Sequence, residues 1–230
     1  MLTSVGDHAI KVVAAGRTDA GVHAYQQVVH FESGADRAPQ AWLLGSNTHL
    51  PGDISLRWVQ AVDPSFNARR SATLRHYRYV MLNARARSGL LDDRAARIIA
   101  TLDAEAMQRA AQALVGEHDF SAFRDADCQS KSPVRKVHAI SVRRLDEFVV
   151  LDIAANAFLH HMVRNIAGTL IVIGQNKQPE SWTGTLLKGR NRSLSGMTAE
   201  ACGLYFVGPE YPPQFGLPAP PAPWFPGHFR

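Results

Sequence analysis

The order of apolar and polar positions predicts strands and loops at the start of the chain. Lys11–Ala15 and Tyr25–Phe31 read as short strands, and the small, polar segment between them, residues 16–22, reads as a loop. Pro51–Gly52 marks a turn, and the apolar stretch Ile54–Val62 after it predicts a further strand. The N-terminal part is therefore predicted to be strand-rich.

Alternating side chains predict more strands beyond residue 72. In Arg75–Leu82, a period of two places Tyr77, Tyr79 and Met81 on one face. Three later segments also read as strands, the first two as a hairpin: Val137–Arg143, Phe148–Ala154 and Leu204–Val207. The segment from Pro209 to Pro226 holds eight of the 13 prolines, which favours an extended tail.

Helical spacing is found in three segments. Asp103–Val115 has an N-cap aspartate, a terminating Gly116 and an apolar stripe. A second helix is expected from Ala157 to Ile173, capped by Asn156, and a third from about Pro179 to Gly189. Because strands and helices do not alternate regularly, the fold class is α+β with a mainly antiparallel sheet. We expect two halves, 1–72 and 73–230.

Composition restricts the class of protein. The 230 residues are 46% hydrophobic and 20% charged, as is usual for a soluble globular enzyme. We expect no membrane-spanning helix and no signal peptide, because no long apolar run is present. Cys128 and Cys202 read as free thiols in a reducing cytoplasm, so neither a disulfide nor a zinc site is expected.

The net charge of +5 favours a polyanionic partner only weakly, so the placement of charge matters more. Two tyrosines, Tyr77 and Tyr79, are interleaved with a run of six arginines: Arg69, Arg70, Arg75, Arg78, Arg85 and Arg87. Such a mixture suits RNA, since arginines neutralise phosphates and aromatic faces accept unstacked bases. A solvated strand face with its aromatic residues turned to the core explains the pattern equally well.

The loop from Gly16 to Ala24 is the most unusual segment, with one cation, one hydroxyl and one carboxylate between glycines. A phosphate-binding loop is disfavoured, because no Gly-Lys-Ser/Thr ending and no following helix are present. From the residues alone, a turn in which Asp19 caps its own backbone is slightly preferred over a catalytic role.

A second polar feature lies in the apolar helix expected at 157–173. His160 and His161 do not suggest zinc, because neighbouring residues on a helix point about 100° apart. Arg164 is more informative, since a buried arginine needs a partner. It is either a side chain that reaches solvent at the helix edge or the partner of a catalytic carboxylate.

These segments together resemble the TruA family of tRNA pseudouridine synthases. Ala15–Ala24 is similar to the active-site signature of that family. The likeness continues, in chain order, through Asn47–Ile54, Phe66–Arg69, Arg75–Tyr79, His118–Phe123 and Phe158–Asn165. The matches run from about Val12 to Val207, nearly the whole chain.

The resemblance implies an isomerase that converts uridine to pseudouridine at positions 38, 39 and 40 of the tRNA anticodon arm. It implies no cofactor and no metal, and a homodimer whose basic clefts hold the RNA. Asp19 corresponds to the nucleophile, Arg164 to its charge partner and Tyr77 to the residue that stacks on the target base. Arg17 is implied in positioning the RNA. Each half is expected to resemble an RNA-recognition motif, with a sheet covered by helices on one side.

One departure from the family concerns the N-terminus, where only 15 residues precede Gly16. The strand and helix that open the family pattern are expected to be missing, apart from a last helical turn, Leu2–Val5, ended by Gly6. The explanations are a misassigned start codon, which we favour, a deliberately shortened sequence and a truncated paralogue. The first predicts upstream in-frame codons for an apolar strand and an amphipathic helix.

Two other functions remain as alternatives. A truncated, non-catalytic RNA-binding paralogue would keep the sheet and the basic groove. A carboxylate-based glycosidase is more distant, because no second acidic residue stands out as the acid partner.

Overall fold

The computed structural model describes residues 2–223 and 225. The chain divides into two compact units. The first unit comprises 1–17, 28–72 and 211–219, and the second comprises 18–27, 73–210 and 220–230. One boundary between the units falls between Ala72 and Thr73, and the loop that carries Asp19 belongs to the second unit. No helix within the described residues has the length and apolar character needed to cross a membrane.

The second unit is built on a sheet whose strands lie in the order β2-β9-β4-β8-β7-β6, with β5 beside β4. The strand bounds are β2 His23–Ala24, β4 Leu74–Leu82, β5 Ala96–Arg97, β6 Gly116–Asp119, β7 Val134–Leu145, β8 Phe148–Ala155 and β9 Leu204–Glu210. The β4–β8, β4–β9, β6–β7 and β7–β8 pairs are antiparallel, while β2–β9 and β4–β5 are parallel. The predicted α+β class with a mainly antiparallel sheet is confirmed.

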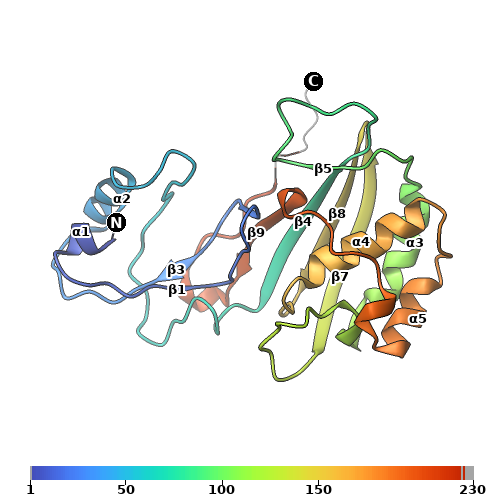
Figure 1. Cartoon of the computed structure of the whole chain (residues 1–230). Helices are drawn as coiled ribbons and strands as arrows, with labels where there is room; N and C mark the ends of the chain where they lie inside the picture. The colour runs from blue at the N-terminus through green and yellow to red at the C-terminus, as the bar shows by residue number, and fades with distance from the viewer. Residues whose placement is uncertain (1, 224, 226–230) are drawn as a thin grey trace. The chain divides into compact units, whose positions relative to one another are not determined.

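The core of this unit lies between the sheet and three helices, which cover one face in Figure 1. These helices are α3 Ala104–Ala111, α4 Met162–Gly174 and α5 Trp182–Gly189. Taken in chain order, β4-α3-β7-β8-α4-β9 follows the split βαβ arrangement, with β4 central between β8 and β9. This order is the RNA-recognition-motif-like topology expected for the C-terminal half.

Local sequence signals explain the first of these helices. The Asp103 side chain accepts a hydrogen bond from the Ala106 amide at 2.9 Å, which caps the N-terminus of α3. The predicted apolar stripe is buried, and its members are Met107, Ala110, Ala111 and Leu114. The last turn of the predicted helix is a 3-10 turn, Gln112–Leu114.

The first unit has little regular structure. Its helices are α1 Leu2–Gly6 and α2 Pro39–Asn47, and its strands are β1 Val13–Ala14 and β3 Val29–His30. The sheet expected in this half is therefore represented, among the described residues, by a two-stranded antiparallel ladder. The helix α2 carries no strong sequence signal and was not predicted.

Two predicted elements need correction. Ile54–Val62 forms no strand, and at Leu56 the Asn47 side-chain amide takes the place of a neighbouring strand, with bonds of 2.7 and 3.0 Å to the backbone. The helix expected from Ala157 begins only at Met162, because His161 adopts a left-handed backbone conformation with φ 57°. In the tail, the described residues include one 3-10 turn, Pro213–Phe215; Trp224 and Pro226 lie outside the described residues.

Candidate active site

Asp19 lies in a tight turn immediately before β2. Its carbonyl oxygen accepts a hydrogen bond from the Val22 amide at 3.1 Å, and Gly21 in this turn has φ 79°. A type II turn requires such a positive φ at its third residue, which glycine adopts without strain. The parallel pairing of His23 with Tyr205 then attaches the loop to the edge of the sheet. The half-buried Asp19 side chain is thus fixed to a rigid element.

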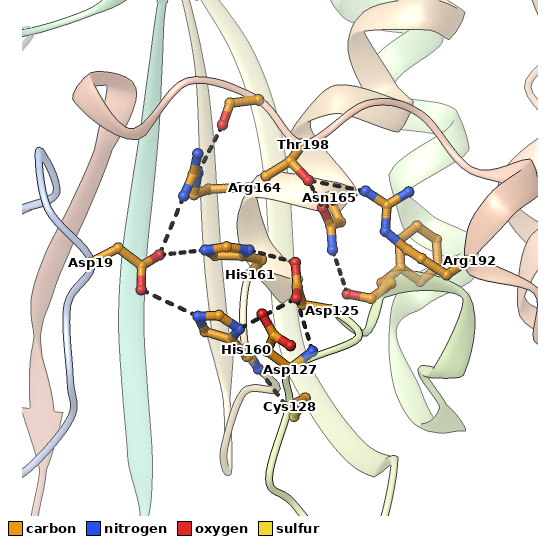
Figure 2. A network of polar contacts seen from close by, with 12 residues as sticks. Asp19, Asp125, Asp127, Cys128, His160, His161, Arg164, Asn165, Arg192 and Thr198 are labelled. Atoms are coloured by element: carbon orange, nitrogen blue, oxygen red, sulfur yellow. Dashed lines mark hydrogen bonds and ion pairs between the residues drawn. The ribbon is translucent and has the colours of Figure 1, made fainter.

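Arg164 approaches this carboxylate from the first turn of α4, as Figure 2 shows. Its Nη1 lies 3.3 Å from Oδ2 of Asp19, and its Nε donates to the carbonyl of Ala199 at 2.8 Å. The side chain is 15% exposed, so it does not extend into solvent at the helix edge. The structure therefore brings together two residues that the sequence separates by 145 positions.

Two histidines complete the surroundings of Asp19 (Figure 2). Nε2 of His161 lies 3.0 Å from Oδ2 of Asp19, and Nε2 of His160 lies 3.5 Å from Oδ1. The two imidazole rings stack with their centroids 3.9 Å apart. The argument that neighbouring helical histidines diverge does not apply, because both residues precede the helix.

Asp125, which sequence reasoning missed, lies on the far side of both rings. Its Oδ2 is 2.7 Å from Nδ1 of His161, and its Oδ1 is 3.7 Å from Nδ1 of His160. The backbone amide of Asp127 and the His161 side chain donate to this carboxylate, and together they lower the pKa of Asp125 below its ordinary value. A second acidic residue therefore belongs to the site, in a segment without any local motif.

Asp19, His160 and His161 offer donor atoms within 4.8 Å of one another, the kind of group that can hold a metal ion. However, Nε2 of His161 is at hydrogen-bond distance from Asp19, and Arg164 adds a positive charge at the same oxygen. We therefore interpret the group as a hydrogen-bonded and charge-paired cluster.

Tyr77 lies on β4 and packs against Phe158 and Phe206, with ring centroids 4.9 and 5.0 Å away. Burial, with a smaller contribution from the charge of Asp19, raises the pKa of Tyr77 to about 12, although Arg75 acts in the opposite direction. The phenol therefore stays protonated at neutral pH. Tyr79 is fully buried and donates to the Glu200 carbonyl at 2.8 Å, so for Tyr79 the interpretation as a core residue is correct.

Arg17, the fourth residue singled out from the sequence, is exposed and is the last residue of the first unit before the chain enters the second at Thr18. Its role in positioning RNA stays a prediction. Cys128 and Cys202 are both free thiols, as expected.

A second polar network supports the helix that carries Arg164 (Figure 2). The fully buried Asn165 donates to the Phe123 carbonyl at 2.9 Å, while its oxygen accepts from Arg192 at 2.9 Å and Thr198 at 2.7 Å. Since these bonds join α4 to the segment that contains Ala199, they stabilise the position of the Arg164 guanidinium.

Comparison with known proteins identifies the class. A family model described as tRNA pseudouridine synthase matches residues 110–212. The chain is 53% identical over 220 residues to proteins named tRNA pseudouridine synthase A from Escherichia fergusonii and Cronobacter sakazakii. Each alignment covers 96% of this chain and 82% of the relative. The chain therefore belongs to the tRNA pseudouridine synthase family, and the resemblance to the TruA branch is confirmed.

Proposed function

We propose that this protein isomerises uridine to pseudouridine in tRNA, with Asp19 as the nucleophile. The reaction breaks the bond from the sugar C1′ to N1 of the base and joins C1′ to C5 of the same base. One proton leaves C5 and one reaches N1, so no atom is lost and no redox cofactor is required. A carboxylate supports this chemistry either as a nucleophile or as a stabiliser of positive charge on the sugar.

The observation that carries the proposal is the ion pair of Asp19 with Arg164. The guanidinium orients the carboxylate and balances its charge at the site. Tyr77, on β4, supplies a face on which the displaced base can stack, and Arg17 is proposed to position the RNA. The uridines at positions 38, 39 and 40 of the anticodon arm are the proposed targets. We further propose that the protein is a homodimer and that it acts in the cytoplasm. The free thiols of both cysteines are compatible with that reducing compartment.

Replacement of Asp19 tests the assignment. Asp19→Asn should abolish the release of tritium from tRNA labelled at uracil C5, while tRNA binding is retained. The exposed Asp92 provides a matched control in the same unit, and Asp92→Asn should release tritium at the wild-type rate. Activity of Asp19→Asn at the wild-type level would remove Asp19 from the nucleophile role. Binding without release by the wild-type protein would favour the non-catalytic RNA-binding alternative.

A further inference from the structure

The His161 imidazole lies between two carboxylates. Its Nδ1 is 2.7 Å from Oδ2 of Asp125, and its Nε2 is 3.0 Å from Oδ2 of Asp19. The contact with Asp125 is a hydrogen bond, and the contact with Asp19 lies within ion-pair distance. The ring therefore connects the two carboxylates through its two nitrogens.

We propose that His161, held by Asp125, is a positioning residue for Asp19 in the isomerisation. The inference rests on the proposed role of Asp19 and deepens it. Because Arg164 also contacts Oδ2, at 3.3 Å, two side chains hold this one oxygen. Among the described residues, Oδ1 is contacted by His160, at 3.5 Å, which is a longer and weaker contact. Oδ1 is therefore the oxygen that attacks, and Oδ2 is the anchored one.

The two histidines are not equivalent in this arrangement. His161 makes the shorter contacts to both carboxylates. Its side chain is 21% exposed, against 39% for the side chain of His160. The two rings stack with their centroids 3.9 Å apart, so His160 covers one face of His161. The shorter contacts assign the positioning role to His161.

Backbone contacts hold the histidine pair and Asp125 in a fixed arrangement. The Asp125 amide donates to the carbonyl of His160 at 3.2 Å, and the amide of Asn165 donates to the carbonyl of His161 at 2.9 Å. The amide of His160 donates to the Cys128 sulfur at 3.4 Å. These bonds orient the rings before any substrate is present, as preorganised sites require.

Charged side chains contact this histidine and its partner Asp19 from several elements. Asp19 approaches from the loop before β2, Asp125 from the segment before β7, and Arg164 contacts Asp19 from α4. Loss of the His161 ring should therefore remove one of the two contacts that hold Oδ2 of Asp19, and loss of Asp125 should release the ring itself.

The first test compares His161→Asn with His160→Asn in steady-state kinetics on tRNA. Asparagine suits the positive φ at residue 161. His161→Asn should lower kcat about 10-fold to 100-fold, with KM for tRNA nearly unchanged, because a transition-state contact is lost. His160→Asn should lose less than about threefold in kcat.

Two further variants keep the test decisive if His161→Asn fails to fold. His161→Gln removes the ring and should also lower kcat, with KM for tRNA nearly unchanged. Asp125→Asn removes the carboxylate that holds the ring and should lower kcat in the same way. Wild-type kcat in these variants, or equal losses of kcat in the two histidine variants, would overturn the proposal.

The outcome for Asp19→Asn separates the two levels of inference. If Asp19→Asn is inactive and His161→Asn behaves as the wild type, only the role of His161 fails. If Asp19→Asn is active, the assignment of Asp19 itself fails, whatever the histidine variants show.

Discussion

The two units bury their apolar residues in different ways. The second unit packs long strands against three helices, and Tyr79, Phe120 and Phe206 are fully buried in the core or beside it. The first unit has strands of two residues, and its aromatic side chains pack in small clusters. In one of them, the Phe66 ring contacts Tyr211 and Phe215 at centroid distances of 5.0 and 5.1 Å.

The polar network of the site is found in the unit with the continuous core. Asp19, Tyr77 and Arg164 are each attached to the sheet or to a helix packed on it. A site on such elements is held more precisely than one on loops, so its charge contacts have a single geometry. The comparison predicts that a charge contact in the second unit affects catalysis, whereas a similar contact in the first unit does not.

The largest expected effect comes from the Arg164–Asp19 ion pair. Arg164→Met should lower kcat roughly 100-fold, the scale of losing one preorganised charge contact. Steady-state rates of tritium release from labelled tRNA measure this loss.

An arginine of the first unit provides the control. Arg37 pairs with Asp7 at 2.7 Å, but the two side chains are 40% and 76% exposed. An exposed pair contributes about 0–1 kcal/mol, so Arg37→Met should leave kcat unchanged. An unchanged kcat for Arg164→Met, or equal losses in both variants, would contradict the comparison.

A smaller effect is expected at Tyr77. The phenol is not assigned a proton-transfer role, because its pKa is raised to about 12. Tyr77→Phe should therefore keep most activity. Tyr77→Ala removes the stacking face and should cost about 1–3 kcal/mol, roughly 5-fold to 150-fold in kcat/KM. Full activity in both variants would refute the stacking role.

Sequence patterns identified the elements whose signals are local. The alternation in 75–82 and the cap and stripe of 103–115 correspond closely to β4 and α3, because caps and periodic stripes depend on residues within a few positions. Ile54–Val62 has the same kind of pattern and yet forms no strand. A strand needs a partner for its backbone groups, and the partner is not encoded in the segment itself.

The residues of the candidate site also differ in whether the sequence identified them. Asp19 and Arg164 stood out through the family resemblance, and their contact joins distant segments. Asp125 has no motif around it, and its relation to His161 arises only when the segment before β7 packs beside α4. The role of the histidines was missed because the helix was expected to start too early. His161 has a left-handed backbone and precedes the helix, and both rings point toward Asp19 (Figure 2).

The smallest expected effect on catalysis, and the sharpest test of the two cores, is at Phe66. This side chain is 6% exposed, so Phe66→Ala should destabilise the first unit by about 3 kcal/mol. Hydrogen exchange should lose protection within 28–72, while amides of β7 and β8 keep theirs, because the cores unfold separately. Phe120→Ala, at a fully buried position of the second unit, should give the reverse pattern. Loss of protection throughout the chain in both variants would mean that the two cores unfold together. The two units would then be distinct in structure but would not differ in when they unfold.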